Sequence, residues 1–225
     1  MAKKVEETKI EVFDNMDSAL SKGEAFLEKN QKNILIGLGA VAFVVIAAIC
    51  YYNFYLTPRE QTAKEEIYKA EDLFKNGAFE AALNGDDEVV GFLDIIDEYG
   101  GTEAGNVAKA YAGLCYKQLG DNEKALKYLA KFDADEKFIQ PAILGAMGDC
   151  YWDSNDVKKA ISYYKKAAES ANNEAMTPFY YKRAAIAYLS INENGKATEL
   201  LEKIVKEYPY YTDMNEVKKY LELAK

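Results

Sequence analysis

The leading candidates for chemistry in this 225-residue chain are its three cysteines, because it contains no histidine and carboxylate or lysine chemistry survives only in principle. Histidine is the commonest general base near neutral pH and a principal zinc ligand. Its absence argues against zinc-dependent hydrolysis and against histidine-assisted serine or cysteine nucleophiles. No CxxC, P-loop, GxSxG or glycine-rich dinucleotide pattern occurs either. We therefore expect a protein that is not an enzyme, with no catalytic residue, no cofactor and no metal site.

The spacing of the cysteines also argues against a disulfide bond. Cys115 and Cys150 each come one residue before a tyrosine, at the same place in two similar stretches of sequence. Equivalent positions on neighbouring packed helices lie about 8 to 10 Å apart, whereas a disulfide needs Cα atoms within about 7 Å. We expect two separate thiols that, like Cys50, serve as small apolar side chains.

The two similar stretches belong to a pattern that occurs three times, and this pattern must position the cysteines. Its copies are "GLCYKQLGDNEKAL" from Gly113, "GDCYWDSNDVKKAI" from Gly148 and "AIAYLSINENGKAT" from Ala185. Each copy has a tyrosine, a turn residue and an alanine at fixed spacing (Tyr116, Tyr151, Tyr188; Gly120, Asn155, Asn192; Ala125, Ala160, Ala197). Small residues let two helices approach closely, and glycine or asparagine tolerates a left-handed turn, so each copy predicts a helical hairpin.

The separations of 35 and 37 residues between the copies are close to the repeat length of tetratricopeptide repeats, which this pattern resembles. The resemblance implies an all-α fold in which helical hairpins stack into a solenoid over residues 57–225. The expected parts of this solenoid are a degenerate unit at 62–100, repeats at about 104–137, 139–172 and 176–209, and a capping helix at 212–225. The insertion "NGDDEVVG" interrupts the degenerate unit.

Residues 34–56, "ILIGLGAVAFVVIAAICYYNFYL", carry no charged side chain. As a helix this stretch rises about 34 Å, enough to cross the roughly 30 Å of a bilayer's hydrocarbon core. Aromatic rings gather at one end and lysines flank the other, as at two membrane interfaces. The stretch is longer than the apolar part of a cleavable signal peptide and is apolar on every face. It therefore predicts a single transmembrane helix rather than a buried core helix.

The segment 1–33 precedes this span. Its apolar residues recur at helical spacing, which predicts an amphipathic helix that lies on the membrane surface, docks on a partner or serves as a spacer. Lys22, Lys29 and Lys32 lie close to the span, and lysines near a span favour the cytoplasmic side. We therefore expect a cytoplasmic N-terminus and an exported C-terminal domain.

The order of a short cytosolic segment, one span and a tetratricopeptide-like domain resembles bacterial envelope proteins of the YfgM type, which are ancillary subunits of the SecYEG translocon. The stretch "ALNGDDEVVGFLDIIDEYGGTEAGNVAKAYAGLCYKQLG" is similar to the first helices of such proteins. The resemblance implies a single-pass protein of the bacterial inner membrane with a periplasmic domain. Its implied partners are translocon subunits, a membrane-anchored periplasmic chaperone and exported clients. The alternative is a cytosol-facing, N-anchored receptor of the protein-import type.

The resemblance also implies a concave groove for a protein partner. In tetratricopeptide arrays the residue after the repeated tyrosine points from the first helix of a hairpin into this groove, and Trp152 occupies that position. The candidate partner groove is Leu114, Lys117, Asp149, Trp152, Lys182, Ile186 and Leu189. The alternative for Trp152 is an indole half-buried against a neighbouring helix.

Charge narrows the class of partner. Tetratricopeptide clamps for acidic chaperone tails carry Lys, Arg and Asn at places where this chain has Ala110, Leu114, Gly145 and Asp149, so this clamp is absent. The net charge of −9 also argues against nucleic acid, whose phosphates need a basic surface. We therefore expect protein partners, and the membrane only through helix 34–56.

Overall fold

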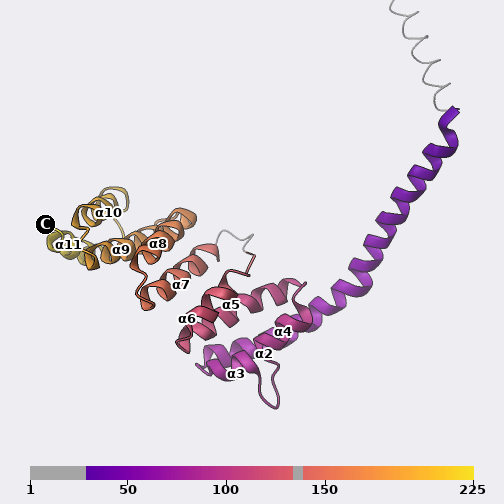
Figure 1. Cartoon of the computed structure of the whole chain (residues 1–225), viewed down its shortest axis with the longest axis horizontal. Coiled ribbons are helices and arrows are strands. Elements are labelled where there is room, and N and C mark those ends of the chain that lie inside the picture. The colour runs from indigo at the N-terminus through magenta and orange to yellow at the C-terminus, as the bar shows by residue number, and fades with distance from the viewer. Residues whose placement is uncertain (1–28, 134–138) are drawn as a thin grey trace, which may run out of the picture. The chain divides into compact units, whose positions relative to one another are not determined.

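The computed structural model describes residues 29–133 and 139–225, and the chain divides into two units, Met1–Pro58 and Arg59–Lys225 (Figure 1). The predicted amphipathic segment 1–33 lies outside the described residues, apart from its last five.

The first unit contains one long apolar helix, which is helical from residue 29 onward in the described part of the chain. Its most apolar window has a mean hydropathy of 2.7, and none of that window is buried. By length and composition this helix can cross a membrane. It fits the predicted single-pass anchor, because apolar side chains that no part of the described chain covers are stable in a lipid environment.

The end of the apolar helix widens into a short π-helix, η1 (Tyr52–Leu56). The backbone N–H of Thr57 bonds to the carbonyl of Tyr52, five residues back, and the Thr57 hydroxyl donates to the same oxygen at 3.0 Å. Pro58 follows directly, and a proline ring inside a helix clashes with the carbonyl four residues earlier. The wider turn relieves this clash and keeps the backbone helical.

The second unit consists of helices joined by short turns, and no strand occurs among the described residues (Figure 1). In chain order they are α2 (Thr57–Lys75), α3 (Phe79–Asn84), α4 (Phe92–Tyr99), α5 (Glu103–Gln118), α6 (Asn122–Leu129), α7 (Gln140–Asp153), α8 (Val157–Ala171), α9 (Met176–Ser190), α10 (Asn194–Glu207) and α11 (Met214–Leu223). Helices α5, α7 and α9 are the first helices of three successive hairpins, and α6, α8 and α10 are the second helices. The predicted all-α hairpin fold is confirmed.

The hairpin turns have the backbone geometry that the repeated pattern predicts. Gly120, Asn155 and Asn192 have φ angles of 82°, 60° and 59°, all in the left-handed region. Glycine has no Cβ to clash there, and asparagine is among the few other residues that tolerate it. The sequence therefore located each turn correctly.

Small residues occur where the two helices of a hairpin are in close contact. A Cβ added at Gly148 on α7 would lie 2.6 Å from the ring of Tyr164 on α8. Ala160, at the predicted contact position of α8, is fully buried. Since protein cores are packed as densely as organic crystals, a larger side chain at either place would push the two helices apart.

Polar contacts attach α2 to the helices that follow it. The Glu60 carboxylate on α2 accepts hydrogen bonds from the backbone N–H groups of Glu103, at 2.7 Å, and Ala104, at 3.3 Å. These N–H groups begin α5 and have no partner within the helix, and a negative charge is favoured at a helix N-terminus. The Arg59 side chain donates to the carbonyl of Glu98 near the end of α4. The degenerate first unit is therefore fixed to the first complete hairpin.

Candidate partner-binding surface

The predicted groove residues lie on the first helices α5, α7 and α9, and we call this side of the second unit the first-helix face. Its members are Leu114, Lys117, Asp149, Trp152, Ile186 and Leu189. Each first helix places two of them three residues apart, almost one helical turn, so that neighbouring turns contribute to one surface.

The carboxylate of Asp149 on α7 contacts side chains from three other helices. Its carboxylate forms ion pairs with Lys117 on α5, at 3.0 Å, and with Arg183 on α9, at 2.7 Å. It also accepts a hydrogen bond from the hydroxyl of Tyr164 on α8, at 2.9 Å. The Asp149 side chain is only 16% exposed, so these partners replace much of the water that a carboxylate requires. Lys117 and Asp149, both predicted for the groove, are in direct contact.

The Asp149 contacts change the expected electrostatics of the face. One carboxylate is matched by two cations, so Asp149 is not a free negative charge for a basic partner. The guanidinium of Arg183 also lies 4.9 Å from the centre of the Tyr164 ring, within cation–π range. The centre of the face is therefore a polar network satisfied within the protein.

The ring of Tyr180 on α9 lies against Gly145 on α7. A Cβ at Gly145 would lie 2.3 Å from the Tyr180 ring, which is itself buried. Burial, followed by the negative charge of Asp149, raises the pKa of Tyr180. The absence of a side chain on Gly145 therefore lets α7 and α9 approach.

Trp152 lies three residues beyond Asp149, near the end of α7, and is 36% exposed. Its neighbours along the helix, Tyr151 and Asp153, differ in environment, since Tyr151 is half-buried and Asp153 exposed. An indole with a third of its surface in solvent is large enough to bury substantial apolar area against a partner. This exposure keeps Trp152 as the leading candidate for a binding anchor.

The other apolar residues of the first-helix face are half-buried, so part of each side chain already packs within the protein. Leu114 packs against the cluster that contains Cys150, and Leu189 packs against the cluster that contains Tyr164. Ile186 is also half-buried. These side chains support the face and leave part of their surface in solvent.

Lys182 has a structural role instead of the predicted contact role. It is only 7% exposed, and its ammonium forms ion pairs with Asp213, at 2.9 Å, and with Glu216. Both carboxylates belong to the start of the last helix, α11. The Lys182 ammonium already donates two charged hydrogen bonds within the protein. Lys182 is therefore not available to contact a partner and is not part of the first-helix face.

The cysteines lie in the helix packing below this surface. Cys115 and Cys150 are free thiols and fully buried. Burial raises the pKa of Cys115 to about 12 and that of Cys150 to about 11. A thiol with such a pKa is protonated near pH 7 and is a poor nucleophile and metal ligand. Among the described residues, no group of three or more Cys, Asp and Glu side chains could hold a metal ion.

Comparison with solved structures identifies the arrangement of these helices. The crystal structure of MamA protein matches with a TM-score of 0.57 and 17% identity, over 73% of this chain and 81% of that one. A Podosopora anserina putative kinesin light chain with nearly identical TPR-like repeats matches with a TM-score of 0.57 and 13% identity, over 72% and 84% of the two chains. Two tetratricopeptide-repeat family models match residues 111–134 and 141–174. The second unit is a tetratricopeptide-like solenoid. No curated protein matches the sequence.

The solenoid assignment makes sense of a residue that the sequence analysis missed. The counterpart of Asp149 in the next copy of the pattern is Ile186, and Arg183 lies three residues before it, almost one helical turn. A long cationic side chain one turn from the equivalent position can reach back to Asp149. Opposite charges at these two places were therefore a usable signal for the Asp149–Arg183 ion pair. Tyr180 carried no comparable signal, because its position over Gly145 depends on how closely α7 and α9 approach.

Proposed function

We propose that this protein is a membrane-anchored scaffold that binds other proteins through the first-helix face. The observation that carries the proposal is a tetratricopeptide-like solenoid with an exposed tryptophan, Trp152, beside a closed polar network. Tetratricopeptide solenoids typically bind protein segments rather than catalyse reactions, and exposed aromatic side chains are favoured binding anchors.

The membrane anchor supports a role close to a membrane-embedded partner. The apolar helix of the first unit holds the solenoid at the membrane, which raises its effective concentration near any partner in the same bilayer. Modest affinity at the first-helix face would then suffice. We propose that the solenoid lies in the periplasm and contacts subunits of the Sec translocon, a membrane-anchored chaperone and exported clients. This finer assignment rests on the resemblance in domain order.

The substitution Trp152→Ala tests the anchor role of the indole. We expect it to weaken binding of co-purifying partner by about thirtyfold, which corresponds to about 2 kcal/mol, while the melting temperature changes little. Binding is measured by affinity purification of the full chain from detergent-solubilised membranes, and stability by circular dichroism.

The matched control is Tyr210→Ala, which removes an aromatic ring that is 94% exposed in the turn between α10 and α11. This variant should bind as wild type. A large fall in melting temperature for Trp152→Ala with unchanged partner recovery would assign Trp152 to the packing of the solenoid and refute its anchor role.

A further inference from the structure

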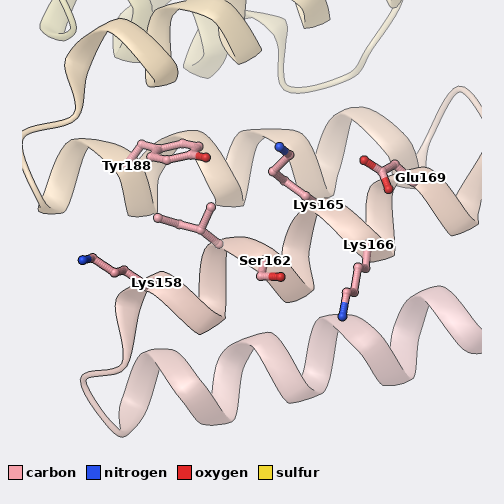
Figure 2. A pocket seen from close by; sticks show the side chains of 7 residues that line it. Lys158, Ser162, Lys165, Lys166, Glu169 and Tyr188 are labelled. Carbon is pink, nitrogen blue, oxygen red and sulfur yellow. The ribbon is translucent and has the colours of Figure 1, made fainter.

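The second helix α8 carries a surface hollow that the first-helix face does not include. The hollow has a volume of about 330 Å³ and is lined by six residues of α8 and one of α9 (Lys158, Ile161, Ser162, Lys165, Lys166, Glu169 and Tyr188) (Figure 2). Figure 2 shows Lys165 and Lys166 pointing to opposite sides of α8.

The charge of α8 is opposite to that of the chain. The helix contains four lysines and one glutamate, whereas the whole chain has a net charge of −9. Lys159 is neutralised by Asp156 at 2.9 Å. In the part of the chain that the structure describes, no carboxylate lies within ion-pair distance of Lys158 or Lys165. Lys165 is also half-buried. Two ammonium groups on one helix without a neighbouring carboxylate favour binding of an anion.

Further groups beside these lysines can also recognise an anion. Ser162 lies between them on α8, and its hydroxyl can donate a hydrogen bond. Tyr188 on α9 also lines the hollow, and its hydroxyl can donate a hydrogen bond. The Lys196 ammonium lies 5.7 Å from the centre of the Tyr188 ring but is paired with Glu193 at 3.3 Å, so it adds no unpaired charge. Charges beyond about 8 Å are strongly screened at physiological salt. Three lysines and one carboxylate, Glu169, line the hollow, so its local charge is positive.

The spacing of Lys158 and Lys165 determines how far apart two negative charges on a ligand must lie. Lys158 and Lys165 are seven residues apart, two helical turns, which separates them by about 10 Å along the axis of α8. Two carboxylates on a partner helix at the same seven-residue spacing would meet both ammonium groups. Glu169, at one end of the hollow, repels a continuous anionic surface such as a lipid membrane but leaves room for two separate carboxylates.

We propose that Lys158, Ser162, Lys165 and Tyr188 form a docking site for an acidic helical segment of a partner protein, with carboxylates seven residues apart. This α8 lysine site is separate from the first-helix face, because its lysines belong to a second helix and it selects a partner by charge rather than by apolar contact. The solenoid can therefore hold two protein segments at once, one through apolar contacts around Trp152 and one through charge.

The test uses the full chain in neutral detergent micelles and a fluorescent helical peptide with glutamates seven residues apart. Fluorescence anisotropy should show binding that weakens as salt rises, because exposed ion pairs are screened. The double variant Lys158→Gln, Lys165→Gln should bind about tenfold more weakly, which corresponds to about 1.4 kcal/mol. Circular dichroism should show an unchanged fold, since neither lysine forms an ion pair among the described residues.

The control variant Lys218→Gln, Lys219→Gln removes two exposed lysines of α11 and should bind the peptide as wild type. Equal weakening in both double variants, or equal binding of a peptide with glutamines in place of the glutamates, would overturn the proposal. A second arm places the chain in nanodiscs with or without phosphatidylserine. Protection of the α8 lysines from amine labelling by anionic lipid alone, without peptide binding, would assign them to the membrane surface instead.

Discussion

At the scale of single residues, steric contacts follow from the sequence pattern more directly than polar contacts do. The repeated small residues predicted close approach, and the structure places Gly148 against the Tyr164 ring. The Asp149 network could not be predicted in full, because its bonds to Lys117 and Arg183 depend on the offset between successive first helices. A pattern along one chain fixes which helix face is buried, but it does not fix that offset.

Gly148→Ala tests the close contact between α7 and α8. The added Cβ would lie 2.6 Å from Tyr164, so we expect a loss of stability of about 1 to 3 kcal/mol, the usual cost of overpacking. Urea unfolding followed by circular dichroism measures the change.

Gly195→Ala in α10 is the matched control, because nothing lies within 4 Å of a Cβ built there. Replacing a helical glycine by alanine in open space should stabilise by up to about 1 kcal/mol, since it lowers the entropy of the unfolded chain. If both substitutions changed stability by the same amount and sign, the proposed packing of Gly148 would be wrong.

At the scale of helices, turns and boundaries were predictable where a local motif determines them. The three turn residues were found from the pattern, and each has the left-handed backbone. The second helix of the degenerate unit is split into α3 and α4, with the insertion between them. The role of Lys182 was not predictable, because its partners Asp213 and Glu216 lie on a helix outside the repeated pattern.

Lys182→Met tests whether this lysine attaches the last helix, α11. The hydrogen bond from Lys182 holds the pKa of Asp213 below its usual value of 3.8. A carboxylate with a lower pKa in the folded state stabilises the protein above about pH 4, and this contribution is lost as the pH falls through the folded-state pKa. We therefore expect the variant to melt several degrees below wild type at about pH 7, with a smaller difference at about pH 3.

The comparison requires melting curves of both proteins at both pH values. A difference in melting temperature that stays constant between these pH values would show that Lys182 acts through packing of its aliphatic chain. Glu216→Gln serves as a second variant, since it removes one charge partner and leaves the packing of Lys182 intact.

At the scale of the whole molecule, the apolar helix and the solenoid could both be predicted from the sequence, whereas the identity of the partner could not. The fold constrains the residue types at the buried positions of a repeat. The residue types at the exposed positions vary between proteins with the same fold. Trp152 and the α8 lysines therefore indicate the chemistry of partners without naming them.

Labelling of Asp87→Cys tests on which side of the membrane the solenoid lies. Asp87 is exposed in the loop between α3 and α4. If the solenoid is periplasmic, a membrane-impermeant maleimide added to intact cells should label this cysteine, while Cys115 and Cys150 stay protected by burial. Labelling only after the inner membrane is permeabilised would favour the cytosol-facing receptor.

Site-specific photocrosslinking in intact membranes tests the central claim most directly, because it reports which face of the solenoid contacts a partner. Benzoylphenylalanine replaces Trp152 in one full-length variant and Tyr210 in another. The account predicts a discrete adduct with a membrane or exported protein from position 152, and none of that mass from position 210. The same adducts from both positions, or none from position 152, would contradict a partner site on the first-helix face.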